Sequence, residues 1–185
     1  MMIPAHALAG IACIHIGWMV SRGNKNWLAI GVVLAFLSHA VIDAFAIFTY
    51  HDANPSGTLF SQFVFWFWLA GGAAVIYWAL NNDRRYGYGI LAALSYDLWD
   101  HWILRSISCA KGGFPDGCMS VYAYEHLHLH HLEWLILDTV FAGVERHYGD
   151  ESYFIVELVC VYLLSVSILW LRNATPLPQQ GDEEE

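Results

Sequence analysis

The chain has 185 residues, of which 57% are hydrophobic and only 14% are charged. Soluble domains are roughly 45–50% apolar and about 25% charged, so this composition indicates a membrane protein. The formal net charge is −9, and no basic cluster resembles a nucleic-acid-binding face, so we expect no nucleic-acid partner.

Five apolar stretches are each about as long as the ~20 residues that a bilayer-spanning helix needs. In chain order they are Ile3–Val20, Trp27–Tyr50, Leu59–Leu80, Gly87–Ile107 and Tyr153–Leu171. A sixth segment, His131–Val144, is shorter and contains two acidic residues, so it is either a short span or an interfacial helix. We therefore predict an all-α integral membrane protein, with residues 1–172 forming one bundle of five or six transmembrane helices.

Residues 173–185 are rich in proline and glutamine and end in four acidic residues, which is typical of a disordered acidic tail. Lysine and arginine gather in the loops 21–26 and 81–86, whereas the loop 51–58 has none. The positive-inside rule therefore places the N-terminus outside the cytoplasm. We expect a protein of the inner (cytoplasmic) membrane. Its expected partners are membrane lipids, with other membrane subunits as additional candidates.

The long outer loop contains two cysteines nine residues apart, Cys109 and Cys118, around a Gly/Pro-rich turn. On the oxidising side of the membrane this spacing favours a disulfide over two free thiols. Cys13 and Cys160 lie inside apolar spans, where packing residues are expected.

Two predicted spans each contain a histidine and an aspartate four residues apart, namely His39 with Asp43 and Asp97 with His101. This spacing places both side chains of a pair on one helix face. Ionisable residues at membrane depth are costly and mark a functional site by default. In the predicted topology both helices run outward, so the pairs lie at matching depths.

Further histidines reach the same outer layer. His6 begins the first span, and the run 126–131 follows the outer loop. The candidate metal ligands are His6, His39, Asp43, Asp97, His101, His126 and His130. His15 lies deeper, where a hydrogen bond to a neighbouring helix is the simpler interpretation. For the two His/Asp pairs, the alternative is an interhelical hydrogen-bond network without metal.

Imidazole and carboxylate ligands suit a divalent ion, zinc first, with iron or manganese as alternatives. A mixed His/Asp set leaves positions open for water or substrate, and the ion lowers the pKa of a bound water. Asp100 and Glu133 are then the candidate catalytic residues, acting as general base or as groups that orient the ligands.

The stretch Ile3-Pro-Ala-His6-Ala-Leu-Ala-Gly10, followed by Ser38-His39-Ala-Val-Ile-Asp43, resembles the membrane-bound metal-dependent hydrolases of bacteria and archaea. These small multi-helix proteins open with a Thr-His-Ala-Leu-like stretch and contain a Ser-His-x-x-x-Asp motif in a later span. The resemblance covers about the first 50 residues. It implies that His6, His39 and Asp43 belong to a metal site and that the activity is hydrolysis.

The leading hypothesis is thus a metal-dependent hydrolase of the outer leaflet, acting on a lipid or another amphiphilic ester or phosphoester. One alternative is a non-haem iron oxidoreductase, because the histidine run 126–131 loosely resembles the histidine boxes of membrane hydroxylases and desaturases. Another is a non-enzymatic accessory subunit of a larger membrane complex. A transporter or proton relay would also use Asp/His chains.

Overall fold

The computed structural model describes residues 3–22, 24–50, 57–104, 106–107, 129, 131–144 and 150–178. Every regular element within these ranges is helical, which confirms the predicted all-α class. The elements are α1 (Ile3–Ser21), α2 (Trp27–Ala44), η1 (Phe45–Phe48), α3 (Leu59–Asn82), α4 (Tyr86–Ala93), α5 (Ser95–Asp97), η2 (Leu98–Leu104), α8 (His131–Val140), η4 (Glu151–Tyr153) and α9 (Phe154–Ala174).

Four helical segments in the described ranges are long and apolar enough to cross a membrane. They are α1, α2 with η1, α3, and η4 with α9, or Ile3–Ser21, Trp27–Phe48, Leu59–Asn82 and Glu151–Ala174. Each matches one of the predicted apolar stretches to within a few residues at either end.

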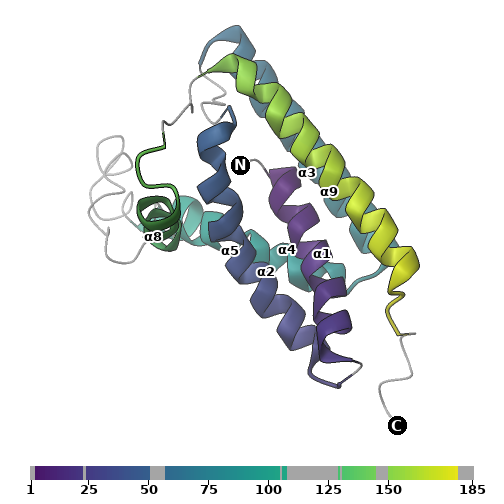
Figure 1. The fold of residues 1–185 in the computed structure, drawn as a ribbon. Helices are drawn as coiled ribbons and strands as arrows, with labels where there is room; N and C mark the ends of the chain where they lie inside the picture. The colour runs from purple at the N-terminus through teal and green to yellow at the C-terminus, as the bar shows by residue number, and fades with distance from the viewer. Residues whose placement is uncertain are drawn as a thin grey trace.

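Helix α1 is the central helix of the molecule. It packs against α2, α3, α4 and α9, and α2 and α9 lie on either side of it (Figure 1). In the apolar window of α1, 67% of the residues are buried inside the protein, compared with only 17% in α9. Side chains at the N-terminal end of α1 therefore point into the protein and not toward a surrounding solvent or lipid.

Pairs of glycines allow α1 to approach its neighbours closely. A Cβ atom on Gly10 would collide with the backbone of Gly89 on α4, and one on Gly17 would lie 2.5 Å from the backbone nitrogen of Gly31 on α2. Small residues at helix contacts let backbones pack tightly within membranes. These crossings set the positions of α2 and α4 relative to the first turns of α1.

The predicted span Gly87–Ile107 is helical but is not one continuous α-helix. Helix α4 ends at Ala93, Leu94 forms a turn, and after α5 the chain forms the π-helix η2. A π-helix hydrogen-bonds from i to i+5, so its side-chain spacing differs from that of an α-helix. The sixth predicted segment yields only the ten residues of α8, about 15 Å long, which is half the hydrocarbon thickness.

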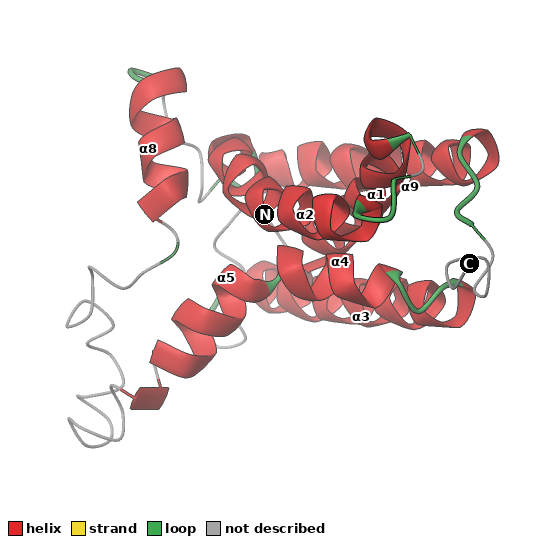
Figure 2. Ribbon diagram, turned by 90° about the horizontal axis from the view of Figure 1, so that it is seen from below, coloured by secondary structure: helices red, strands yellow, loops and turns green. Residues whose placement is uncertain are grey.

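Seen from below the first view, the long helices gather on one side, while α5 and α8 lie at the other (Figure 2). Helix α8 reaches the bundle through the end of α2 and η1, where Leu137 packs with Ala44 and Ile47. The described ranges thus contain four helices long enough to cross a membrane, and two shorter helical segments, α4–α5–η2 and α8, lie between α3 and α9 in the chain, so the predicted count of five or six spans is not confirmed.

The structure describes residues 173–178, the first part of the predicted tail. Helix α9 continues to Ala174, and the carbonyls of Thr175 and Pro178 accept hydrogen bonds from His15 (3.1 Å) and Arg85 (2.8 Å). Residues 179–185 lie outside the described ranges. So do Cys109 and Cys118, and the cysteines that are described, Cys13 and Cys160, are free thiols.

Candidate metal centre

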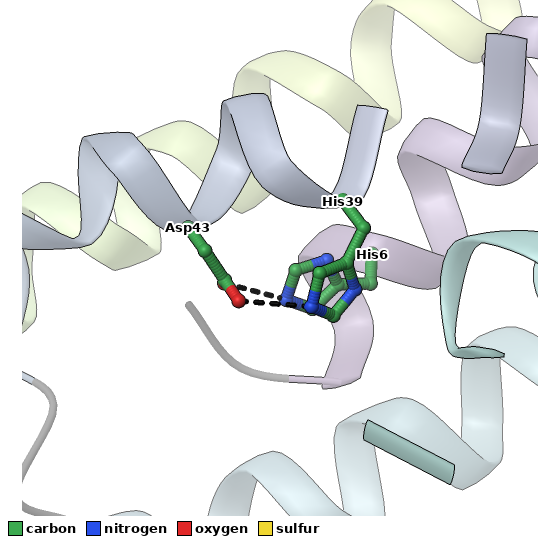
Figure 3. Close-up of side chains that lie close together, drawn as sticks. All are labelled: His6, His39 and Asp43. Carbon is green, nitrogen blue, oxygen red and sulfur yellow. Dashed lines mark ion pairs between the residues drawn. The ribbon is translucent and has the colours of Figure 1, made fainter. Parts of the chain in front are cut away.

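Three of the predicted ligands meet between α1 and α2. His6 comes from the first turn of α1, and His39 and Asp43 lie one turn apart near the end of α2 (Figure 3). Nε2 of His6 lies 3.0 Å from Oδ1 of Asp43, and Nε2 of His39 lies 2.9 Å from Oδ2 of the same carboxylate. The group assembles because α1 and α2 form an antiparallel hairpin, which brings the start of one helix beside the end of the other.

The whole group is buried. His6 is 1% exposed, His39 0% and Asp43 5%. The imidazole rings of His6 and His39 stack with centroids 4.2 Å apart, so both rings present their Nε2 edge to the carboxylate. Burying a charged carboxylate is expensive unless a partner of opposite charge accompanies it.

The protonation of His39 follows from its second nitrogen. Nδ1 lies 2.6 Å from the carbonyl oxygen of Ala93, and a carbonyl only accepts, so Nδ1 carries the proton and donates it. A ring protonated on Nδ1 alone presents the lone pair of Nε2 to the Asp43 oxygen. Two lone pairs at 2.9 Å repel each other, so a cation has to lie between them: either a proton or a metal ion.

The donor set fits a divalent metal. Ligand atoms of His6, His39 and Asp43 all lie within 4.8 Å of one another. Zinc sits about 2.0–2.2 Å from each nitrogen or oxygen ligand, which separates two tetrahedral ligands by roughly 3.4 Å. The observed 2.9 and 3.0 Å separations are a few tenths of an ångström shorter, so small side-chain shifts would admit the ion.

The groups that contact His39 resemble those that orient a metal-binding histidine. Metal-binding histidines usually donate their other ring N–H to a carboxylate or backbone carbonyl, which fixes the tautomer. Here Ala93, the last residue of α4, supplies that carbonyl, because the last carbonyls of a helix have no partner within it. On the other side the ring of Tyr96 stacks on His39 at 4.4 Å.

Two fully buried side chains were not among the predicted site residues, and one of them, Tyr96, lies against His39. Tyr96 is fully buried. In the sequence, its position next to Asp97 in a predicted span is only a weak indication that it belongs to the site. Glu157 is also fully buried, on α9, and its signal was stronger because an acidic residue inside an apolar span marks a candidate functional position.

Of the second predicted pair, only the side chain of Asp97 is described. It is half-buried and does not join His6, His39 and Asp43 in the group found among the described residues. The predicted pairing assumed α-helical spacing, whereas the chain between Asp97 and His101 enters a π-helix. His101 lies in η2, and its side chain is outside the described part of the structure, as is the side chain of Glu133 in α8.

Asp100, predicted as a catalytic residue, is fully buried, and its Oδ1 accepts a hydrogen bond from the backbone N–H of Leu129 at 3.1 Å. Asp100 lies four residues after Tyr96, whose ring stacks on His39. The remaining predicted ligands, His126 and His130, lie outside the described residues.

His15 behaves as the sequence predicts. Its Nδ1 donates to the carbonyl of Thr175, and Nε2, which then bears the lone pair, accepts from the Tyr86 hydroxyl at 2.8 Å. Both partners are uncharged, so neutral His15 has a donor and an acceptor and needs no cation.

Comparison of the chain with protein-family models, with curated proteins and with solved structures gave no match. The function is therefore inferred from the residues of this site.

Proposed function

We propose that the chain is an integral membrane protein that binds one divalent metal ion through His6, His39 and Asp43. The observation that carries the proposal is the buried approach of Nε2 of His39 to within 2.9 Å of the Asp43 carboxylate, while Nδ1 of the same ring donates to the Ala93 carbonyl. A buried cation site of two histidines and one carboxylate is what a catalytic metal uses when it keeps a coordination position open.

The arrangement of the helices supports a membrane topology with the site in the outer half. The metal ligands lie at the end of the α1–α2 hairpin opposite the turn that contains Arg22 and Lys25. Arg172, at the end of α9, donates to Asn82 at the end of α3, so the C-terminal end of α9 shares the basic side. By the positive-inside rule this side faces the cytoplasm. The interrupted segment α4–α5–η2 then returns the chain outward, which makes five crossings.

The proposed reaction is hydrolysis of an ester or phosphoester in a lipid or another amphiphile. A bound divalent ion supplies Lewis-acid activation of water and of the substrate oxygen. The protein contributes orientation: Ala93 fixes the His39 tautomer, and Tyr96 holds the ring from its face. Asp100, which is fully buried, is the proposed general base that takes a proton from water. A site enclosed by membrane-spanning helices favours a membrane lipid as substrate.

The donor set also favours a second candidate. Two histidines and one carboxylate with open positions form the ligand set of non-haem Fe(II) oxygenases. Zinc is the first choice because the resemblance of the N-terminal motifs points to hydrolases, but the identity of the metal separates the two functions directly.

The test is elemental analysis of the detergent-purified full chain, followed by assays of lipid esters and phosphoesters before and after chelation. We expect close to one equivalent of zinc per chain and a hydrolysis rate that falls on chelation and returns when zinc is added back. Bound iron with turnover that consumes O₂ would establish the second candidate instead.

A matched pair of variants makes the assay specific to the site. Asp43→Asn keeps the size of the side chain but removes the charge, so it should abolish both metal retention and hydrolysis. Asp83→Asn, an equivalent change at the cytoplasmic turn, should retain both. Full metal content in Asp43→Asn would refute the proposed site.

A further inference from the structure

A groove separates α2 and η1 from α9. Its volume is about 490 Å³, within the range of about 300–1,000 Å³ found for small-molecule sites. The lining residues include Ile42, Phe45 and Phe48 on the α2–η1 side and Val156, Leu163 and Ser167 on α9. Their spacing of three, four or seven residues shows that each helix contributes one continuous face.

The lining is suited to an apolar occupant. Apart from Cys160, the only polar side chains that line the groove are Thr49 and Ser167. The hydroxyl of Thr49 donates to the carbonyl of Ala46 at 3.2 Å, so it does not offer its proton to a ligand in the groove. A ligand with a charged or strongly polar body would lose its hydration in this groove without finding partners there.

The length of the groove fits one leaflet of a bilayer. Its lining on α9 extends over twelve residues, from Val156 to Ser167, whose ends are about 16 Å apart at the α-helical rise of about 1.5 Å per residue. The hydrocarbon core of a bilayer is about 30 Å thick, so the groove is about as long as the hydrocarbon of one leaflet.

The groove is open on the outside of the bundle. Helices α2 and α9 both pack on α1 and are not packed closely on each other. Phe45, Val156 and Leu163 at the rim are 46%, 38% and 56% exposed. In a membrane crossed by these helices, such a rim faces the acyl chains of the surrounding lipid.

We propose that this groove is a binding site for one acyl chain of a bilayer lipid, held lengthwise between α2–η1 and α9. The proposal rests on the membrane location proposed above and is independent of the metal. Ile42 and Asp43 are adjacent in sequence and therefore about 100° apart around α2. The groove and the metal ligands thus occupy different faces of the same helix.

The experiment uses the full chain reconstituted in phosphatidylcholine vesicles that contain a photoactivatable group on one acyl chain. After irradiation, mass spectrometry locates the labelled peptides. We expect labelling to concentrate on residues 42–49 and 156–167. Cys160→Trp places a large ring in the groove and should reduce this labelling about fivefold, since a tryptophan covers about 150–250 Å².

Val159→Trp is the matched control. Val159 is one residue away on α9, is 50% exposed and does not line the groove, so its replacement should leave the labelling of 42–49 unchanged. Ser167→Phe provides a second groove-filling variant if Cys160→Trp does not purify as a folded protein.

Equal labelling of all exposed apolar faces, unaffected by either groove-filling variant, would overturn the proposal and indicate ordinary boundary lipid. Cross-links between two chains across the groove would also overturn it, because a second copy would then be the occupant. His39→Ala should label the groove normally. If it does so while wild-type protein contains no metal, only the metal proposal fails.

Discussion

His6 and His15 lie nine residues apart on the same helix, and each is 1% exposed. Their partners differ in charge. His15 has a hydroxyl and a carbonyl, both neutral, and these match the donor and the acceptor of a neutral imidazole. His6 shares a carboxylate with His39, whose own proton is directed elsewhere.

The comparison shows that burial of a histidine does not by itself indicate a metal. What distinguishes the two positions is whether the hydrogen bonds are complete without an added cation. Around His15 they are complete, and the result is a link between α1, α4 and the end of α9. Around His6, His39 and Asp43 a proton or a metal ion is still required between the histidine and carboxylate atoms, and the three side chains lie close enough together to hold a divalent ion.

The most direct test of the difference between His6 and His15 is to replace each histidine in turn. His6→Ala should lower metal content at least about tenfold, because even loss of an outer-shell partner costs about 10–100-fold in metal affinity. His15→Ala should leave the metal content of the folded protein unchanged. Elemental analysis of monodisperse samples measures both, and equal losses in the two variants would remove the distinction.

A second prediction concerns the crossing that positions the site. Gly10→Val forces side-chain atoms into the backbone of Gly89, and overpacking of this kind costs about 1–3 kcal/mol or more. Separating α1 from α4 also shifts the Ala93 carbonyl, which orients His39, relative to His6, so metal affinity should fall as well. Thermal unfolding in detergent and metal titration report the two effects.

Gly71→Ala is the control for this crossing. An added Cβ there would meet only side-chain atoms, at 3.4 Å from Pro4 and 3.9 Å from Trp68. The variant should be as stable as wild type or slightly more so, since alanine is the better helix former. A loss of stability equal to that of Gly10→Val would mean that the close crossing is not what limits substitution.

The neutral network at His15 should contribute less. Tyr86→Phe removes the donor to His15 Nε2 and should lower the free energy of unfolding by about 1 kcal/mol, as expected for one hydrogen bond between buried helices. Metal content should not change. Tyr88→Phe, at a 57% exposed position on the same helix, should change neither quantity; if it destabilises as much, the His15 bond is not the cause.

The smallest effect is expected at the turn between α3 and α4. Partial burial favours the neutral acid, but hydrogen bonds from Arg85 outweigh it and lower the pKa of Asp83 below 3.8. A group whose pKa is lower in the folded state stabilises the protein above its unfolded pKa, and the contribution is lost as the pH falls through the folded value.

Asp83→Asn should therefore be slightly less stable than wild type at pH 7, and the difference should shrink as the pH falls through the lowered pKa of Asp83. Unfolding curves of the two proteins across pH 2–7 give the measurement. A constant difference over this range would show that the side-chain charge of Asp83 plays no part.

The sequence alone determined the long helices and the core of the site. Apolar stretches of about 20 residues specify α1, α2 with η1, α3 and α9, because a helix satisfies its own backbone hydrogen bonds wherever it lies. The four-residue spacing of His39 and Asp43 fixes their common face for the same local reason. A short turn after α1 makes an antiparallel hairpin, which brings His6 beside them.

Only the tertiary structure decided what surrounds that core. Composition cannot distinguish an α-helix from the π-helix of η2, so the sequence could not show that Asp97 stays outside the group. Nor could it select the Ala93 carbonyl and the Tyr96 ring as neighbours of His39. These contacts depend on the Gly10–Gly89 crossing between segments about 80 residues apart, and such long-range packing is not encoded in any local pattern.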